Sequence, residues 1–335
     1  MTGHEMDLSI IVINWNSIEF TRDCLESIQA TTPGLKYEVI VVDNASEDEC
    51  ASLSSRFPWI KLVLSDRNLG FAGANNLGVD HSCGRAILFL NPDTVVAADA
   101  LPRMLRHLNS SPEVGAVGGR LLNRDLTLQM SCVQPFPTIC NQLFSIDWLK
   151  RRWPMFPLWG VSALFSESRD GIQEVEVVSG ACLMVKRTAL ERIGRFSTEY
   201  FMYAEEMDLC YKLRQAGYKI CHVGAAEVVH FGGQSTKKKR IGFSDILMRE
   251  SVFKLLRKFR GNLYAQLYRT GLFLSAAARL AMLLPLLALA PVIPNRDDVV
   301  GAFRKWRLIA RWSLSLERWT REVGSSEASP TVVKP

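Results

Sequence analysis

The sequence predicts an α/β protein built on a mostly parallel sheet with flanking helices, followed by a helical region that is both basic and apolar. Over residues 1–235, short runs of apolar and β-branched residues alternate with segments of helical periodicity, as in a parallel sheet with crossover helices. The net charge of +6 is spread unevenly, because Lys and Arg far outnumber Asp and Glu between Lys237 and Arg321, whereas acidic residues are in excess elsewhere. We therefore expect an α/β domain at 1–235, a helical region at 236–323 and a disordered tail at 324–335.

The individual elements follow from the apolar pattern in chain order. Buried strands are expected at residues 8–14, 37–43, 60–64 and 86–90, and further strands at 114–119, 175–180, 182–185 and 226–230. Helices are expected at residues 18–30, 71–81, 99–108 and 188–193, and between Glu205 and Gly217. Ser46, with Glu49 three residues later, has the spacing of a capping box and predicts one more helix start.

The stretch from Ala86 to Thr94 contains the first candidate for a functional site. Its apolar run must end at Pro92, which has no N–H for a sheet ladder, so Asp93 lies just past the carboxyl end of a central strand. Ligands of open α/β sheets bind at that edge, and a carboxylate there suits a divalent metal ion that carries a diphosphate. Asp also caps turns and helices, and this stretch alone leaves both roles open.

Several classes of protein are disfavoured by the sequence. The first strand is followed by Asn14-Trp-Asn-Ser instead of G-x-G-x-x-G, and the sequence contains no P-loop motif, so neither a dinucleotide-binding domain nor a P-loop NTPase is expected. The eight Cys residues are scattered without metal-ligand spacing, which indicates reduced core residues in a cytosolic protein. We find no secretory signal pattern at the N-terminus.

Three carboxylates begin the helix that ends at Gly217. Glu205, Glu206 and Asp208 fall in its first turn, where they favour the positive end of the helix dipole, and that structural role suffices to explain them. Glu205 and Asp208 share one face of the helix while Glu206 points elsewhere, so their roles can differ. His230 ends the last predicted strand beside Gly232 and Gly233, a better position for a ligand than most lone His residues have.

Five motifs together resemble family 2 glycosyltransferases, and most of all the rhamnosyltransferase-like bacterial branch that builds cell-surface polysaccharide. The resemblance covers roughly residues 7–235. The motifs are Val12-Ile-Asn-Trp-Asn-Ser, Val41-Val-Asp-Asn-Ala-Ser, Arg67-Asn-Leu-Gly-Phe-Ala-Gly-Ala-Asn-Asn-x-Gly, Asn91-Pro-Asp and Phe201-Met-Tyr-x-Glu-Glu-x-Asp-Leu. The resemblance implies a GT-A fold, a nucleotide-sugar-binding α/β sheet.

The resemblance also implies roles for single residues. Asp43 would bind the base of the nucleotide, with Arg67 and Asn68 beside the base and Asn75 near the ribose and diphosphate. Asn14 and Asn91 are grouped with them as nucleotide-sugar-binding residues.

The metal site and the catalytic base are implied in the same way. Asn91-Pro-Asp93 matches the Asp-x-Asp element of the family with its first Asp replaced, which makes Asp93 the carboxylate for Mg²⁺ or Mn²⁺, and His230 matches a His that completes the metal site. Glu206 matches the catalytic base, although the motif is Glu-Glu here instead of Glu-Asp, so Glu205 and Asp208 remain alternatives.

The expected reaction is an inverting, metal-dependent transfer of a sugar, rhamnose by the resemblance, from a nucleotide-diphosphate donor. The acceptor would be a glycan or a lipid-linked sugar in cell-envelope polysaccharide synthesis. The alternatives are a nucleotidyltransferase, which would need a Gly-rich basic loop after the first strand, and a non-catalytic sugar-binding membrane module. A processive polymerase would need several clean transmembrane helices and a Gln-x-x-Arg-Trp stretch.

The basic rear of the chain suggests an anionic membrane surface as a partner. The run Lys237 to Arg240 is too short to indicate nucleic-acid binding, and residues 243–268 have the pattern of an amphipathic helix. Residues 271–293 are long enough to span a bilayer, but Arg279 and two prolines interrupt them. We therefore favour an in-plane or re-entrant interfacial segment over a transmembrane helix or a buried hairpin. The expected location is cytoplasmic, peripheral to the inner face of the cell membrane.

Overall fold

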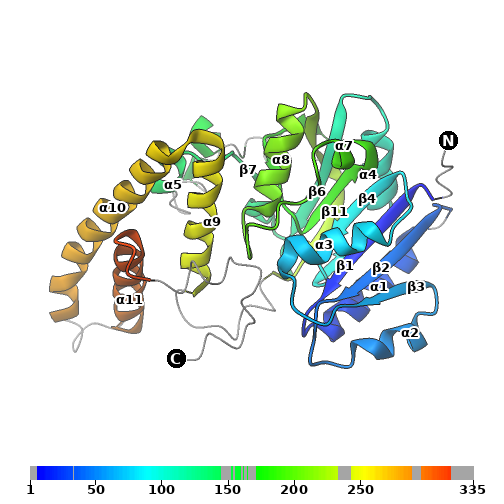
Figure 1. Ribbon diagram of the computed structural model, residues 1–335, viewed down its shortest axis with the longest axis horizontal. Helices are drawn as coiled ribbons and strands as arrows, with labels where there is room; N and C mark the ends of the chain where they lie inside the picture. The colour runs from blue at the N-terminus through cyan, green and yellow to red at the C-terminus, as the bar shows by residue number, and fades with distance from the viewer. Residues whose placement is uncertain are drawn as a thin grey trace. The chain divides into compact units, whose positions relative to one another are not determined.

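The computed structural model describes residues 6–32, 34–144, 152, 153, 155–159, 161, 164, 171–232, 243–288 and 296–317. The chain forms two compact units, which are coloured by chain position in Figure 1. Unit 1 consists of Met1–Phe136, Asp147–Thr198 and Glu205–Ser235, and unit 2 consists of Pro137–Ile146, Glu199–Ala204 and Thr236–Pro335. Unit 2 thus includes two short segments from the range in which the sequence predicts the α/β domain.

Unit 1 is built on a mixed sheet of nine strands within the described residues. Its order is β3-β2-β1-β4-β10-β6-β11-β5, with β8 paired to β11. The strands are β1 (Leu8–Asn14), β2 (Tyr37–Asp43), β3 (Ile60–Leu64), β4 (Ala86–Leu90), β5 (Thr94–Val96), β6 (Val114–Leu122), β8 (Ile172–Glu174), β10 (Cys182–Lys186) and β11 (Lys219–His230). The short strands β7 (Val133–Gln134) and β9 (Val177–Val178) pair separately.

The direction of the strands brings several carboxyl ends to one edge of the sheet. β3, β2, β1 and β4 are parallel to one another. β10 runs antiparallel to both β4 and β6, and β11 is parallel to β6, so β11 has the same direction as β4. Every residue of β1 and β4 is buried, as expected for central strands covered on both faces.

The helices of unit 1 pack around this sheet (Figure 1). They are α1 (Ile18–Thr31), α2 (Leu53–Arg56), α3 (Gly70–Asp80), α4 (Ala100–Leu108), α7 (Arg187–Arg192) and α8 (Glu205–Gln215). The helix α3 lies very close to β1 at Gly78, where an added Cβ would be 2.5 Å from Cγ2 of Ile11. Only glycine permits this approach, which lets α3 pack directly on the middle of β1.

The helix start predicted at Ser46 is wrong. The Ser46 hydroxyl accepts hydrogen bonds from Asn14 Nδ2 at 3.0 Å and from the Asn16 N–H at 3.1 Å, so it joins two loops instead of capping a helix. The first helical turn after β2 is the 3₁₀ segment Cys50–Ser52. Glu49 precedes it and makes no capping hydrogen bond with its side chain. The contact to the loop after β1 takes the hydroxyl that the capping box would need.

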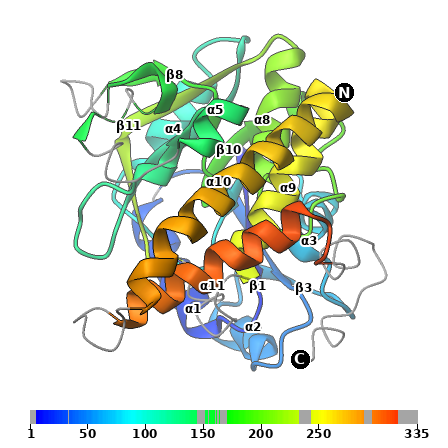
Figure 2. The ribbon, with the colours of Figure 1, turned by 90° about the vertical axis from the view of Figure 1, so that its left-hand side faces the viewer.

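Unit 2 is a helical bundle in the residues that the structure describes. Its helices are α5 (Ile139–Leu143), α9 (Phe243–Arg260), α10 (Asn262–Ala288) and α11 (Arg296–Ser313). The amphipathic helix predicted over 243–268 is divided at Gly261, whose φ of +87° belongs to the left-handed region that ends helices. Figure 2 shows α10 and α11 lying side by side, and α10 also packs on α9.

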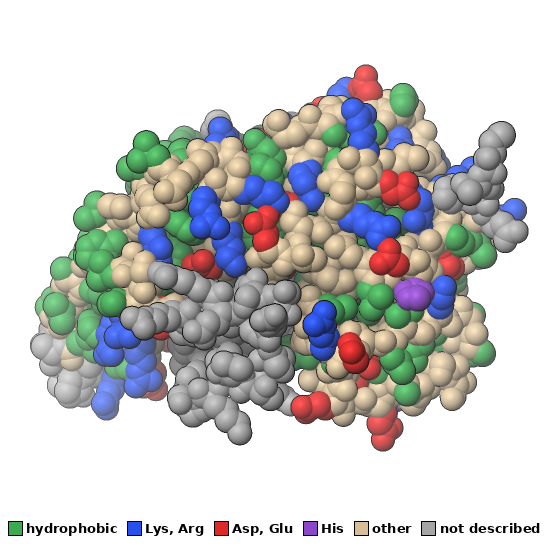
Figure 3. Space-filling model, viewed as in Figure 1, with side chains coloured by type: hydrophobic (Ala, Val, Ile, Leu, Met, Phe, Trp, Pro, Cys, Tyr) green, Lys and Arg blue, Asp and Glu red, His purple; other side chains and the backbone are tan. Residues whose placement is uncertain are grey.

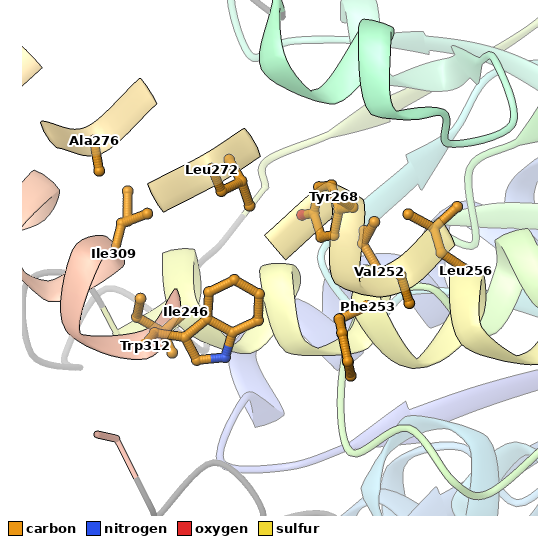
Figure 4. Close-up of a cluster of buried hydrophobic side chains, with 10 residues drawn as sticks. Ile246, Val252, Phe253, Leu256, Tyr268, Leu272, Ala276, Ile309 and Trp312 are labelled. Atoms are coloured by element: carbon orange, nitrogen blue, oxygen red, sulfur yellow. The ribbon is translucent and has the colours of Figure 1, made fainter. Parts of the chain in front are cut away.

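A cluster of apolar side chains forms the core of unit 2 (Figure 4). Its members are Ile246, Val252, Phe253, Leu256, Ala265, Tyr268, Leu272, Ala276, Ile309 and Trp312. Trp312 is fully buried, and its indole N–H donates to Glu250 Oε2 at 2.8 Å. The Arg269 guanidinium lies over the Phe253 and Trp312 rings, 5.1 and 4.9 Å from their centroids. The buried tryptophan therefore joins three helices of the bundle.

The segment Glu199–Ala204 is held by α9 within unit 2. Ser251 Oγ donates to the Met202 carbonyl at 2.8 Å, and Lys258 Nζ lies 2.6 Å from Glu199 Oε1. Tyr203 and Ala204 adopt left-handed φ angles of 70° and 71°, a combination that costs energy for residues other than glycine.

Among the described helices, α10 alone is long and apolar enough, by length and composition, to cross a membrane, over Asn262–Leu287. Little of its most apolar part is buried. Residues 271–288 of the predicted in-plane segment belong to α10, and residues 289–293 lie outside the described part. The basic run Lys237 to Arg240 and the predicted tail at 324–335 also lie outside it.

Candidate active site

Asp93 and His230 come together at the carboxyl edge of the sheet. Asp93 follows β4, and the Phe231 N–H donates to its carbonyl at 2.9 Å. His230 ends β11 and pairs with Thr94 of β5, which places its Nε2 3.3 Å from Asp93 Oδ1. The Asp93 side chain is 10% exposed and the His230 side chain 14%. An imidazole nitrogen and a carboxylate oxygen therefore face each other in a largely desolvated position.

Asn91 and Gln129 complete the surroundings of His230. Asn91 Nδ2 lies 3.4 Å from His230 Nε2, and its N–H donates to the Ala181 carbonyl at 3.0 Å. On the other side of the ring, His230 Nδ1 lies 2.7 Å from Gln129 Oε1. Gln129 was not predicted from the sequence, since it stands in a loop with no motif and reaches His230 only through the fold.

The three carboxylates of α8 have different environments. Asp208 is fully buried, accepts a hydrogen bond from Ser197 Oγ at 2.6 Å and lies 3.2 Å from Lys212 Nζ. Glu205 is 1% exposed, and its Oε1 has no hydrogen-bond partner among the described residues. Glu206 is only partly buried, as expected from its different face of the helix.

Burial changes the acidity of two of these groups. It raises the pKa of the Glu205 carboxyl well above the ordinary value, and the neighbouring Glu206 charge adds to the effect. Burial also raises the pKa of Glu206. Both carboxyls are therefore harder to ionise than a Glu side chain in water.

Glu206 lies beside the turn between β9 and β10, which also contacts Asn91. A Cβ added to Gly180 would be 3.5 Å from Glu206 Cβ and 3.5 Å from Phe71 Cζ, so the backbone at Gly180 passes close to both. The next residue, Ala181, accepts the hydrogen bond from the Asn91 N–H. A short run of chain therefore joins the Glu206 helix to the segment that contains Asp93.

The nucleotide-binding candidates lie at the ends of β1, β2 and β3. Asn14 and Asp43 end adjacent parallel strands in register. Asn14 is fully buried, donates to Asp48 Oδ1 at 3.0 Å and accepts from Thr21 Oγ1 at 2.9 Å. The structure thus shows Asn14 holding loops together. The Ser46 N–H donates to Asp43 Oδ1 at 3.3 Å, and Asp43 is half-buried at the surface of this edge.

The loop after β3 lies beside Asp43. The Ser65 N–H donates to the Asp43 carbonyl at 2.9 Å, and Arg67, two residues later, is exposed. Asn68 Oδ1 accepts from Asn44 Nδ2 at 3.1 Å, so this loop is tied to the residue after Asp43.

Asn75, the last of the nucleotide-binding candidates, lies in a helix and not at a strand end. It is buried within α3, and its Nδ2 donates to the Phe71 carbonyl one turn earlier in the helix.

A second group of possible metal ligands lies on the nucleotide side. The ligand atoms of Asp43, Asp48 and Cys50 are all within 4.8 Å of one another. Burial and the two carboxylates raise the pKa of the Cys50 thiol to about 12, so it stays protonated at neutral pH and is a poor ligand. All eight cysteines are free, and six of them are buried, as the sequence predicts.

Comparison with known proteins identifies the class of this enzyme. The model of the family described as "Glycosyl transferase family 2" matches residues 9–194, more than half of the chain. The chain belongs to this family and is a glycosyltransferase.

The curated relatives are similar at modest identity. The low-salt glycan biosynthesis hexosyltransferase Agl10 of Haloferax volcanii is 25% identical over 228 residues, which cover 67% of each chain. An N-acetylglucosaminyl-diphospho-decaprenol L-rhamnosyltransferase of Mycobacterium tuberculosis is 28% identical over 210 residues, covering 59% of this chain and 67% of the relative.

The solved structures define the fold. The mannosyltransferase PcManGT from Pyrobaculum calidifontis, solved with GDP-Man and Mn²⁺, has a TM-score of 0.56 at 21% identity and covers 95% of this chain and 86% of its own. The fold is that of GT-A glycosyltransferases, as the sequence predicts.

Proposed function

We propose that this glycosyltransferase moves a sugar from a nucleoside-diphosphate donor to a hydroxyl acceptor, with inversion at the anomeric carbon. The observation that carries the proposal is the meeting of Asp93 Oδ1 and His230 Nε2, 3.3 Å apart, at the carboxyl edge of the sheet. This edge is where ligands of open α/β sheets bind, and the turn at Gly180 and Ala181 lies against both Glu206 and Asn91.

The residues present fit a divalent cation. Asp93 supplies a carboxylate oxygen and His230 an imidazole nitrogen, and this mixed pair of ligands favours Mn²⁺ over Mg²⁺, which prefers oxygen ligands. Solved relatives with the same fold were crystallised with Mn²⁺. A bound cation would offset the charge that develops on the departing diphosphate.

Glu206 is the best placed of the three carboxylates to act as the base. Asp208 is engaged by Ser197 and Lys212, and Glu205 is buried in a position that favours its neutral form. Glu206 is partly exposed, and its raised pKa brings it closer to neutral pH, which suits proton abstraction.

The chemistry of the proposed transfer balances with these groups. The acceptor oxygen forms a bond to the anomeric carbon while the bond from that carbon to the diphosphate oxygen breaks. The Glu206 carboxylate receives the hydroxyl proton, and the nucleoside diphosphate leaves with the bonding electron pair. One displacement of this kind inverts the anomeric configuration.

The nucleotide would lie along the ends of β1, β2 and β3. Asp43 would bind the base, and its position at the end of β2, next to the loop that carries Arg67 and Asn68, supports this role. Asn14 would act indirectly, since its amide donates to Ser46 and Asp48 in the loop that follows Asp43. Asn75 would act near the ribose and diphosphate from within α3.

The relatives suggest the donor sugar and the acceptor. One relative is named for the transfer of L-rhamnose to a decaprenyl diphosphate sugar, and another for the transfer of a hexose in glycan biosynthesis. We propose rhamnose from its nucleotide sugar as donor and a glycan or polyprenyl-linked acceptor. Such an acceptor places the enzyme on the anionic cytoplasmic face of the cell membrane, where envelope polysaccharide is assembled.

The proposal is tested by measuring the release of nucleoside diphosphate from a panel of nucleotide sugars, with Mn²⁺, with Mg²⁺ and with EDTA. We expect release from one donor, and its loss in EDTA and in Asp93→Ala. Binding of a donor without release at any metal concentration would instead indicate a non-catalytic sugar-binding module. Formation of pyrophosphate from a nucleoside triphosphate and a sugar phosphate would indicate a nucleotidyltransferase.

A further inference from the structure

One side of α10 carries a row of exposed apolar side chains. This outer face consists of Leu263, Leu267 and Leu274, with exposed fractions from 53% to 76%, and Met282, Leu284 and Leu286 are exposed near the end of the helix. The first three are spaced by four and seven residues, the spacing of one helix face. Figure 3 shows hydrophobic side chains gathered over this end of unit 2, with Lys and Arg side chains beside them. Large exposed apolar patches mark interaction sites.

Both arginines of α10 turn away from the outer face. Arg279 lies 4.3 Å from the centroid of the Trp306 ring of α11 and donates to Ser275 Oγ. Arg269 lies over the Phe253 and Trp312 rings and donates to the Trp312 carbonyl at 2.8 Å. The only charges in this helix therefore face the bundle, and the outer face carries none.

The inner face of α10 packs in the core of unit 2. Ala265, Tyr268, Leu272 and Ala276 recur every three or four residues and are buried against α9 and α11. A helix that crossed the bilayer would have to leave this core or take its charged neighbours into hydrocarbon. The half-buried helix therefore suits the plane of the interface, with only one face among the lipids.

The helices on either side of α10 are basic. Their exposed cations are Arg257, Lys258 and Arg260 of α9 and Arg296, Arg304, Arg307 and Arg311 of α11. Exposed carboxylates among the described residues of these two helices are Asp297 and Asp298. An apolar row beside an excess of cations is complementary to a bilayer that contains anionic headgroups.

We propose that the outer face of α10 docks in the plane of an anionic lipid bilayer, at the depth of the headgroups and upper acyl chains. This inference deepens the membrane location proposed above, but it does not depend on the chemistry of sugar transfer.

The test is flotation of the full-length protein with vesicles of phosphatidylcholine and phosphatidylglycerol. We expect the wild type to bind these vesicles. For the double variant Leu267→Asp/Leu274→Asp we expect the partition coefficient to fall by about tenfold or more, because two leucine side chains no longer enter the bilayer. The control is Leu64→Asp, since Leu64 of β3 and Leu274 are both 62% exposed. Unchanged thermal unfolding of the double variant verifies that it folds.

Three further measurements decide between occupants and modes of binding. Binding that survives extraction with alkaline carbonate would show a spanning helix and overturn the in-plane arrangement. A dimer in sedimentation experiments without lipid that the double variant dissociates, together with no vesicle binding, would assign the face to a second copy of the chain. Donor hydrolysis in solution is expected to be unchanged in the double variant, so a failure of docking is distinguishable from a failure of the proposed chemistry.

A second, independent observation concerns Gln129. Its Nε2 donates to Asn123 Oδ1 at 3.2 Å, and its N–H donates to the Leu121 carbonyl at 2.9 Å. Because the amide nitrogen is used in this way, the amide oxygen faces His230 Nδ1, 2.7 Å away. An oxygen in that position accepts a hydrogen bond from Nδ1–H, so the other ring nitrogen, Nε2, presents its lone pair.

The turn that carries Gln129 is itself held by short-range bonds. The Asn123 carbonyl accepts a hydrogen bond from the Leu126 N–H, and the Asn123 N–H donates to the Thr127 carbonyl. The Thr127 hydroxyl in turn donates to Asp125 Oδ1 at 2.6 Å. The amide oxygen of Gln129 is thus offered to His230 from a well-tied loop.

We infer that Gln129 is a positioning residue, which sets the tautomer of His230 so that its Nε2 can join Asp93 in holding a cation. Partners of this kind orient ligating histidines in many metal sites, and their removal weakens metal affinity by about 10-fold to 100-fold. The inference rests on the cation site of the proposed function.

Long-range ¹H–¹⁵N correlation spectra of the metal-free protein report the His230 tautomer directly, with His230→Ala used for assignment. We expect the Nδ1–H form in the wild type, a mixture in Gln129→Leu, and recovery in Gln129→Glu, whose carboxylate also accepts the proton. Mn²⁺ titration followed by electron paramagnetic resonance should show about tenfold weaker binding for Gln129→Leu. The matched control is Gln134→Leu, which removes a nearby glutamine whose amide donates to the Ser131 carbonyl.

An unchanged tautomer and unchanged Mn²⁺ affinity in Gln129→Leu would overturn the role of Gln129. If the wild type bound no Mn²⁺ while the tautomer still responded to Gln129, the cation site would fail and the hydrogen-bond assignment would stand.

Discussion

Replacing the three carboxylates of α8 one at a time separates the base from its neighbours. Glu206→Gln keeps the size of the side chain, so its packing beside Gly180 is retained and only the proton acceptor is lost. A general base contributes about 10²–10⁴-fold to a rate, and we expect kcat to fall by this factor, or ~3–5 kcal/mol of transition-state stabilisation. The fold of this variant should be as stable as that of the wild type.

The neighbouring variants should behave differently. Glu205→Gln mimics the neutral form that burial favours, so kcat should change by less than about threefold. Asp208→Asn loses a buried ion pair with Lys212, which has two further partners in Ser197 and Arg195. We expect a loss of stability of ~1–3 kcal/mol with little change in kcat of the folded fraction.

The assay is single-turnover transfer with saturating donor and acceptor, measured from pH 4 to 9. Because burial raises the pKa of Glu206, the acidic limb of the wild-type profile should lie above the ordinary Glu value of 4.5. The reasoning is refuted if Glu206→Gln keeps near-normal turnover, or if Glu205→Gln loses as much activity as Glu206→Gln does.

Three further predictions concern stability, each measured by urea or thermal unfolding. The pKa of Glu205 is raised in the folded state, so the contribution of this group to stability is fully present below its unfolded pKa and is lost as the pH rises through its folded pKa. The variant Glu205→Gln should therefore raise Tm at pH 8 and have little effect on Tm near pH 4. Trp312→Ala should cost ~3–5 kcal/mol, while Glu250→Gln, which keeps an acceptor for the indole N–H, should cost far less; equal losses would contradict the packing argument. Gly78→Ala should cost ~1–3 kcal/mol because its Cβ meets Ile11, and the additional change Ile11→Val should leave much of that cost in place, since Cγ2 remains.

Much of unit 1 could be predicted from the sequence because its central strands are self-evident. A run such as Ile10 to Ile13 is buried on both faces of the sheet, and only a parallel strand between helices requires that pattern. The same reasoning placed Asp43 and Asp93 at one edge, since both follow such runs. It predicted the strand at 182–185 but not its direction, since β10 enters the sheet antiparallel between β4 and β6 with an apolar composition like that of its neighbours.

The failures have local physical causes. Ser46 carries the right spacing for a cap, but a hydroxyl bonds to whichever donor the fold brings near, and Asn14 reaches it first. Gln129 gave no signal, because its contact with His230 joins residues 101 apart in the chain. Arg279 interrupts an apolar stretch in the sequence, yet in three dimensions it lies on Trp306, so the side of the helix away from the bundle stays uncharged.

The discontinuous make-up of unit 2 has a consequence for how the chain can be cut and how it folds. The segments Pro137–Ile146 and Glu199–Ala204 find their partners in helices that begin only at Phe243. During synthesis they emerge from the ribosome well before those partners, so this part of the protein is assembled last and through contacts distant in sequence. A truncation after Ser235 would therefore not release an intact domain. It would leave Glu199–Ala204, which lead directly into Glu205, without the helices of unit 2 that they pack against.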